Sequence, residues 1–132
     1  MTVHVAVAVI VNHHKQVLVA LRHPDQHQGG LWEFPGGKVE QSETVLAALK
    51  RETKEELDLT ITQAAPLLQV SHDYADKTVL LDVWLVTDFD GQANGREGQP
   101  IRWCAIEELH IEDFPAANAT IIESLQTMLI PN

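Results

Sequence analysis

The chain has 132 residues, 45% of them hydrophobic, and a formal net charge of −10 at pH 7. This length allows one hydrophobic core, so we expect a single domain over residues 1–132, and a monomer. The acidic balance argues against a nucleic acid polymer as partner, because such binding depends on clustered lysine and arginine. A single cysteine, Cys104, excludes an internal disulfide and suits the reducing cytoplasm.

The N-terminal part predicts a strand, a turn and a second strand. Valines recur at every second position from Val3 to Val11, which is typical of a strand. This apolar run is too short to span a bilayer, so we expect no membrane contact. A polar turn over residues 12–15 leads to a second apolar run at 17–21, and together these segments predict a hairpin.

The next segment combines a loop, a glycine turn and a helix. Residues 22–30 have the composition of a loop, and the glycine pair at 36–37 predicts a turn. A helix is predicted from Thr44, as its N-cap, to about Asp58. The positions of this helix expected to face the core are Val45, Leu46, Leu49, Thr53 and Leu57.

Strands and helices alternate through the second half of the chain, which indicates an α/β domain. The predicted elements are strands at 66–74 and 78–87 around a turn at 75–77, an acidic loop at 88–98, a strand at 101–104, a helical turn at 105–109 and a helix at about 118–129. In the last helix, the residues expected to face inward are Ile121, Ile122, Leu125 and Leu129.

Three glutamates of the predicted 44–58 helix, Glu52, Glu55 and Glu56, stand at i, i+3 and i+4. They cluster on one side of a helix, where like charges repel one another. Glu56 also lies at the edge of the apolar stripe, where an unpaired carboxylate is costly. A divalent cation relieves both penalties, and Mg²⁺ bound by a few carboxylates and substrate phosphates suits the pattern. A solvated acidic helix face is the alternative.

The run from Gly37 to Leu59 resembles the signature of the Nudix hydrolases, G-x5-E-x7-R-E-U-x-E-E-x-G-U, in which U is aliphatic. Thr53 replaces an aliphatic residue, and we expect its hydroxyl to bond the carbonyl one turn back. Asp58 replaces a glycine after the helix, at a position that favours the left-handed conformation. All charged positions of the signature are present, namely Glu43, Arg51, Glu52, Glu55 and Glu56.

Three further segments, at 32–38, 97–100 and 113–118, are similar to the MutT-type branch of this family, whose type member hydrolyses oxidised guanine nucleoside triphosphates. The resemblance implies a Nudix-like α/β/α sandwich with a mixed β-sheet and a metal-binding helix after the Gly-Gly loop. It also implies Mg²⁺ as the cofactor, with Mn²⁺ able to substitute.

The resemblance further implies which residues hold the metal and act on the phosphates. Either Glu52 or Glu97 is the general base, since a base must reach the attacking water, and Glu52 is favoured. Arg51 is expected to orient Glu43 rather than to contact the substrate, and Lys38 either meets a phosphate or is a solvated surface lysine. The implied metal ligands are the Gly36 carbonyl and the carboxylates of Glu52, Glu55, Glu56 and Glu97.

Base recognition in the branch maps to a second set of residues. An asparagine amide both donates and accepts, so Asn118 can pair with a purine edge that carries a carbonyl beside an N–H. Asn118 is otherwise a helix N-cap. Arg22 forms a planar fork to a base edge or phosphate, or is a surface loop arginine. The whole implied set is Arg22, His27, Glu33, Phe34, Pro35, Gly36 and Asn118.

The function implied by the resemblance is that of a Mg²⁺-dependent nucleoside triphosphate pyrophosphohydrolase. The implied reaction converts 8-oxo-dGTP to 8-oxo-dGMP and pyrophosphate, which cleanses the nucleotide pool. A first alternative is a Nudix enzyme with the same chemistry that prefers CTP, dCTP or another triphosphate. A second alternative is a catalytically silent Nudix fold that only binds nucleotides. Loss of signature glutamates would mark that case, and none is lost here.

Overall fold

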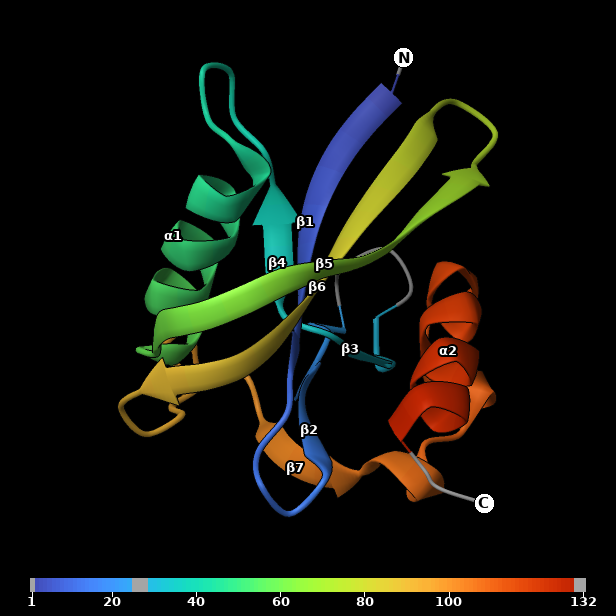
Figure 1. Cartoon of the computed structure of the whole chain (residues 1–132). Coiled ribbons are helices and arrows are strands. Elements are labelled where there is room, and N and C mark those ends of the chain that lie inside the picture. Colours follow the sequence, from blue (N-terminus) through green and yellow to red (C-terminus); the bar gives the residue numbers. More distant parts are fainter. Residues whose placement is uncertain (1, 25–28, 130–132) are drawn as a thin grey trace.

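The computed structural model describes residues 2–24 and 29–129 and forms a layered α/β structure (Figure 1). The α/β class predicted from the sequence is confirmed. In chain order the elements are β1 (Thr2–Ile10), β2 (Gln16–Leu21), β3 (Trp32–Glu33), β4 (Gly36–Lys38), α1 (Val45–Leu57), β5 (Thr60–Asp73), β6 (Thr78–Asp90), β7 (Ile101–Ala105), the short 3-10 helices η1 (Ile106–Glu108), η2 (Ile111–Asp113) and η3 (Ala116–Asn118), and α2 (Ala119–Leu129).

A mixed four-stranded sheet lies between the two α-helices (Figure 1). Its strand order is β4-β1-β6-β5, in which β1 runs parallel to β6 and the other neighbours are antiparallel. A smaller antiparallel sheet, with the order β3-β2-β7, lies toward the lower end of the view. The parallel pairing brings the N-terminal strand beside residues 78–86, far away in sequence.

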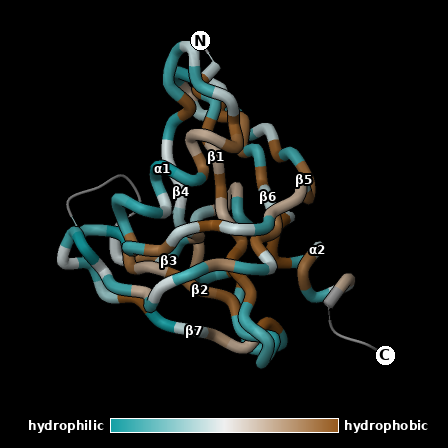
Figure 2. The backbone as a smooth tube through the Cα atoms, turned by 60° about the vertical axis from the view of Figure 1, so that its left-hand side comes forward, coloured by the Kyte–Doolittle hydropathy of each residue, from teal (hydrophilic) through white to brown (hydrophobic). Residues whose placement is uncertain are grey.

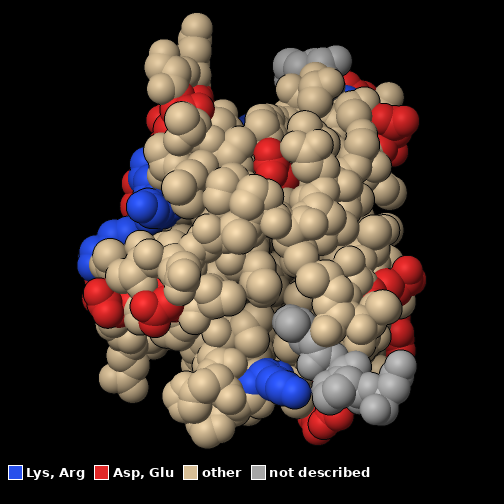
Figure 3. Space-filling model, viewed as in Figure 1, with Lys and Arg blue, Asp and Glu red and all other residues tan. Residues whose placement is uncertain are grey.

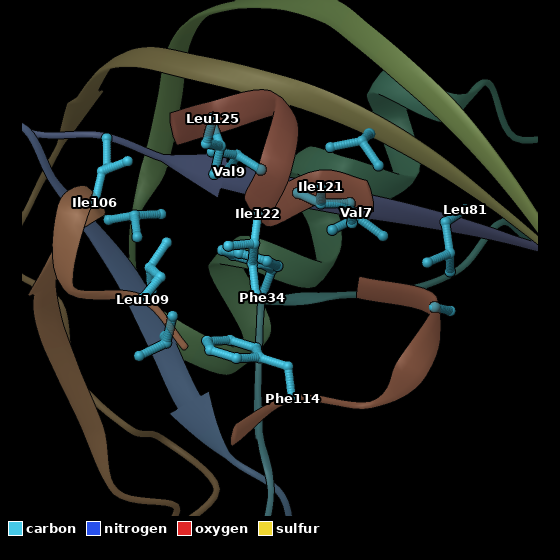
Figure 4. Packing of buried hydrophobic residues seen from close by; sticks show 14 residues of the cluster. Val7, Val9, Phe34, Leu81, Ile106, Leu109, Phe114, Ile121, Ile122 and Leu125 are labelled. Atoms are coloured by element: carbon cyan, nitrogen blue, oxygen red, sulfur yellow. The ribbon is translucent and has the colours of Figure 1, made fainter. Parts of the chain in front are cut away.

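Strand β1 supplies side chains to two hydrophobic clusters, one on each face of the mixed sheet. Ala6, Ala8 and Ile10 pack with α1, whereas Val7 and Val9 pack with α2. Figure 4 shows the α2 cluster, and Figure 2 shows hydrophobic residues concentrated in the central strands. The period-two valine pattern therefore belongs to a strand that is buried on both faces, as is usual for strands with a parallel neighbour and helices on each side.

The predicted hairpin between the first two strands is wrong beyond its first residue pair. Strands β1 and β2 lie in different sheets and are joined only by an isolated bridge between Val11 and Val17. Both edges of β1 are already occupied, by β4 and by β6, so no edge remains along which β2 can pair.

The predicted turn at Gly36 and Gly37 is also wrong, because these residues belong to strand β4. They pair with Val7 and Ala6 of β1. A side chain at Gly36 would collide with the backbone carbonyl of Ala6, so glycine is required here by the close approach of two strands.

Strand β5 begins at Thr60, six residues before the predicted start at 66, and β6 continues to Asp90. The chain turns back immediately after Asp58, and Thr60 already pairs with Asp90. Pro66 lies inside β5 next to a register shift between Pro66 and Leu68. Proline is tolerated there because β5 is an edge strand with an irregular ladder.

Both α-helices are found close to the predicted bounds. The Thr44 hydroxyl accepts a hydrogen bond from the Ala47 N–H (3.1 Å), and Asp58 adopts the left-handed conformation with φ 59°, so both predicted cap geometries are confirmed. The final helix begins at Ala119 rather than at 118. Its predicted inward residues Ile121, Ile122 and Leu125 are fully buried. The side chain of Leu129 lies outside the described part. Among residues 2–24 and 29–129, no helix has both the length and the apolar character needed to cross a membrane.

The expected hydrogen bond of the Thr53 hydroxyl to the preceding turn is wrong. Thr53 is fully buried, and its Oγ1 has no hydrogen-bond partner among the described residues. A buried hydroxyl without a partner keeps its full desolvation cost, so Thr53 weakens the core that Leu49 and Leu57 form around it.

A pair of identical substitutions is expected to have opposite effects on the free energy of unfolding. Thr53→Val keeps the side-chain shape, removes the unpaired hydroxyl and should stabilise the protein by about 1 kcal/mol. Thr44→Val removes the N-cap acceptor and should destabilise it by about 1 kcal/mol. Urea unfolding of both variants and the parent checks this. Destabilisation by Thr53→Val would show that the hydroxyl has a partner after all.

Candidate active site

Arg51 binds and orients two of the signature carboxylates, those of Glu43 and Glu52. Its guanidinium donates to both oxygens of Glu43, with Nε–Oε2 at 2.7 Å and Nη2–Oε1 at 3.0 Å. The predicted contact between Arg51 and Glu43 is therefore present, and these hydrogen bonds lower the pKa of Glu43 to about 2. Arg51 also donates through Nη1 to Oε1 of Glu52 (2.8 Å) and through Nη2 to the carbonyl of Lys38 (3.2 Å). A charge-assisted, bidentate contact of this kind stabilises the pair and also fixes the orientation of the carboxylate.

The carboxylate of Glu52 lies directly against the backbone of Gly37. A side chain at Gly37 would collide with all three carboxylate atoms of Glu52. Glu52 is thus held between the Arg51 guanidinium on its own helix and the bare backbone of β4. The absence of a Cβ at Gly37 makes this position of the carboxylate possible, which explains why the signature begins with glycine.

Glu56 lies among other carboxylates. Burial raises the pKa of Glu56 most, followed by the neighbouring charge of Glu52 and then by Glu97 and Glu33, to about 9 in total. Burial also raises the pKa of Glu33, although Arg22 opposes that shift. Glu55, by contrast, is exposed and only touches Arg51 at 3.5 Å. The carboxylates Glu52, Glu97 and Glu33 therefore act together on Glu56 and disfavour its charged form.

The donor set fits a hard divalent cation. No three His, Cys, Asp or Glu side chains in the described part of the chain already surround a common point, and Glu52 is turned toward Arg51. Mg²⁺ does not need a closed cage, because it keeps several waters and takes one or two carboxylates together with substrate phosphates. The neighbouring carboxylates favour the protonated form of Glu56. A bound cation would relieve their mutual repulsion and favour the charged form.

A cavity of about 420 Å³ has Glu33 in its wall, one of the carboxylates that raise the pKa of Glu56, whereas Glu52, Glu56 and Glu97 do not line it. It lies between the mixed sheet and the segment 115–118, and Gly36 belongs to its wall as well as to strand β4. Its apolar floor comes from the two parallel strands. The residues of this floor are Val5, Val7, Val79 and Leu81.

Most residues predicted for base recognition do line this cavity, namely Arg22, Glu33, Phe34, Gly36 and Asn118. Pro35 does not, because it is buried and its carbonyl accepts the Ala8 N–H (2.8 Å). His27 lies outside the described residues. Lys38 is exposed on β4 and does not line the cavity.

Two of the lining residues already have defined partners. Arg22 Nη1 contacts Glu33 Oε1 at 2.5 Å, which ties the end of β2 to β3. The ring of Phe34 stacks on Phe114 with centroids 5.3 Å apart (Figure 4). These two contacts hold together the cavity wall on this side.

The side-chain amide of Asn118 has no hydrogen-bond partner among the described residues. Its backbone N–H bonds the Pro115 carbonyl (2.9 Å), but within the described residues its side-chain amide makes no hydrogen bond, so it does not cap α2 through that side chain. The amide lines the cavity with both a donor and an acceptor available for a ligand.

The sequence reasoning missed the polar lining residues Tyr74, Asp76 and Lys77, as well as the apolar ones of the floor. The three polar residues lie around the turn between β5 and β6, which the sequence predicted as a plain turn. The parallel pairing of β1 with β6 brings this turn into the lining of the cavity, and no local pattern signals that pairing. Figure 3 shows acidic side chains scattered over this face, with basic ones at the α1 edge and in a separate group at the lower centre.

Comparison with known proteins agrees with this geometry. The chain is 34% identical over 124 residues to the 8-oxo-dGTP diphosphatase of Escherichia coli (strain K12), covering 94% of this chain and 96% of the relative. It is 33% identical over 122 residues to the CTP pyrophosphohydrolase of the same organism, covering 92% and 90%. A solved structure of MutT, from work on Aliivibrio salmonicida and Vibrio cholerae, superposes with a TM-score of 0.83 at 35% identity and covers 98% of this chain and 100% of that one.

A family model described as NUDIX domain matches residues 6–124. That range includes every strand except the start of β1, helix α1 and the first half of α2, together with every residue of the carboxylate cluster. Nudix hydrolases generally use a divalent metal ion. Because the match extends over nearly the whole chain, this protein belongs to the Nudix family, as a hydrolase that acts on phosphoric anhydrides.

Proposed function

We propose that this protein is a Mg²⁺-dependent nucleoside triphosphate pyrophosphohydrolase of the cytoplasm that converts 8-oxo-dGTP to 8-oxo-dGMP and pyrophosphate. The observation that carries the proposal is the cavity with an apolar floor, which has in its wall the unpaired amide of Asn118 and Glu33, a carboxylate that acts on the signature residue Glu56. The relative named 8-oxo-dGTP diphosphatase, similar over 94% of the chain, supports the same substrate. Mn²⁺ is expected to substitute for Mg²⁺.

The cavity suits a flat base with a polar edge. The side chains of Val7, Val79 and Leu81 offer an apolar surface to a ring face, and such pockets bury most of a ligand's surface. The Asn118 amide can accept from a ring N–H and donate to the adjacent carbonyl, an arrangement that an oxidised guanine presents. Arg22, held by Glu33, lies on the same wall and is available to a base edge or a phosphate.

The chemistry is assigned to the carboxylates of α1 and of the loop after β6. Glu56, Glu52, Glu97 and the Gly36 carbonyl would hold the metal, which supplies charge withdrawal from the phosphates and a lower pKa of water. Glu52, oriented by Arg51 and Gly37, takes the proton of the attacking water. The water oxygen bonds to the β-phosphorus, and the bond from that phosphorus to the oxygen bridging to the α-phosphorus breaks.

A second substrate class has its own support. The relative named CTP pyrophosphohydrolase is 33% identical over 122 residues, which is close to the value for the 8-oxo-dGTP diphosphatase. A cytosine edge also presents a donor and an acceptor to the Asn118 amide.

Measuring pyrophosphate release at low micromolar 8-oxo-dGTP, dGTP, dCTP and CTP, with Mg²⁺ and with chelator, separates the two substrate classes. We expect kcat/KM to be highest for 8-oxo-dGTP, and a preference for CTP would assign the second class.

Asn118→Ala is expected to lower kcat/KM for 8-oxo-dGTP by about 10- to 100-fold, the equivalent of one or two lost hydrogen bonds in a desolvated pocket. The loss should be smaller for a triphosphate that the amide does not recognise. Asn118→Asp, which keeps the shape but loses the donors, should be as impaired. Thr120→Ala, an exposed change in the first turn of α2, is the control. An equal loss for all triphosphates would mean that Asn118 does not read the base.

A further inference from the structure

We infer that Gln99 is a positioning residue, whose side-chain amide anchors Glu97 to the end of helix α1 at Glu56. The inference rests on the proposed function, in which Glu97 and Glu56 both serve the metal. It concerns the backbone at these two residues rather than their carboxylates.

The C-terminal end of α1 is closed by the loop that follows β6. The last carbonyls of an α-helix have no partners within the helix. Here the carbonyl of Glu56 accepts the backbone N–H of Arg96 (3.0 Å), and the carbonyl of Leu57 accepts that of Asn94 (3.0 Å). The loop is therefore attached to the turn of the helix from which Glu56 projects.

One side chain joins that helix end to Glu97. Nε2 of Gln99 donates to the Glu56 carbonyl (3.3 Å), and Oε1 of Gln99 accepts the Glu97 N–H (2.9 Å). Gln99 is half-buried, whereas its neighbours in the loop are exposed. A planar amide that uses both ends in this way links the two backbones through one rigid group and satisfies both its donor and its acceptor.

Among the described residues, no other side chain bonds the backbone of Glu97. It stands inside a tight turn closed by the Gly98 N–H and the Gly95 carbonyl (3.0 Å), and its side chain is exposed. Within residues 2–24 and 29–129, its carboxylate makes no ion pair or hydrogen bond. The nearby contact between Arg96 and Asp58, at 3.7 Å, is exposed and contributes little. The position of the Glu97 carboxylate therefore follows from its backbone, which Gln99 holds.

The test compares Gln99→Met, which has a similar length but no donor or acceptor, with Gln92→Met, an exposed change in the same loop. Mn²⁺ affinity is measured on the substrate-free protein by electron paramagnetic resonance. We expect Gln99→Met to weaken Mn²⁺ binding by about ten-fold, as removal of a group behind a metal ligand does. We also expect kcat to fall with KM unchanged and the Glu97 amide to exchange hydrogen faster. Gln92→Met should change none of these quantities.

A double variant separates positioning from general damage to the fold. In a Glu97→Gln background, Gln99→Met should weaken Mn²⁺ binding by less than about two-fold, because the residue through which it acts is already disabled. An equal loss in both backgrounds, or a lowered Tm with unchanged Mn²⁺ affinity, overturns the inference. If Gln99→Met does not fold, Gln99→Glu is used, which keeps the acceptor for the Glu97 N–H and should retain protection of that amide. Fast exchange of the Glu97 amide in a folded Gln99→Glu variant also overturns the inference.

If the parent protein hydrolyses none of the triphosphates, the proposed function fails, while Mn²⁺ binding and amide exchange still decide the role of Gln99.

Discussion

Replacing Glu56 by glutamine is expected to abolish metal-dependent hydrolysis and, at the same time, to stabilise the metal-free protein at alkaline pH. Groups that only support a metal ligand are worth 10- to 100-fold in metal affinity or activity, so loss of a ligand should cost more than about 100-fold. The stabilisation arises because Glu56 is half-buried beside Glu52, with Glu97 and Glu33 near enough to act on it, and without a cation its charged form is unfavourable.

The sign of the stability effect follows from proton binding. The pKa of Glu56 lies at about 9 in the folded protein and near 4.5 when unfolded. Between these pH values the folded state holds one proton more than the unfolded state. The free energy of unfolding therefore falls as pH rises through this window, by up to about 1.4 kcal/mol per pH unit. Glutamine cannot lose a proton, so Glu56→Gln should remove this part of the slope.

Urea unfolding in the presence of chelator, at pH 6, 7, 8 and 9, measures the slope for the parent and for Glu56→Gln. Glu107→Gln, an exposed substitution on η1, is the matched control and should behave as the parent in both stability and turnover. Retention of Mg²⁺-dependent turnover by Glu56→Gln would show that Glu56 is not a metal ligand. A parallel pH dependence in the two proteins would contradict the raised pKa.

The two adjacent glycines of β4 are expected to fail in different ways when replaced by alanine. At Gly37 the added methyl would occupy the place of the Glu52 carboxylate, which is the end of a flexible side chain and can move away. The fold should survive, but Glu52 would lose its position beside Arg51. A displacement of about 1 Å in a catalytic group can cost roughly 100-fold, and we expect a fall in kcat of that order for Gly37→Ala.

Gly36→Ala provides the contrast one residue away. Its methyl would meet the backbone carbonyl of Ala6, which cannot yield without moving a central strand. We expect destabilisation of about 3 kcal/mol, at the upper end for overpacking. Urea unfolding and single-turnover hydrolysis on both variants check the pair. If Gly37→Ala retained full activity, the position of Glu52 against Gly37 would be irrelevant to turnover.

The sequence alone determined the features that depend on local chemistry. Helix α1 is signalled by a hydroxyl cap at Thr44, a helical apolar period and a residue that tolerates the left-handed conformation at Asp58. The fork of Arg51 onto Glu43 could be predicted because the spacing of the two residues fits the family signature. These features involve contacts within or next to one element, so the pattern of residues is sufficient to predict them.

Only the tertiary structure decided how distant segments meet. The parallel pairing of β1 with β6 brings the Asp76–Lys77 turn to the cavity and leaves no edge of β1 for β2. The sequence could not show that Gly37 receives the Glu52 carboxylate, or that Gln99 links Glu56 to Glu97. The unpaired hydroxyl of Thr53 was likewise invisible, since a lack of partners is a property of the packed core. The local spacing of residues predicts the type of chemistry. The position of each group depends instead on contacts between strands, helix and loop that are far apart along the chain.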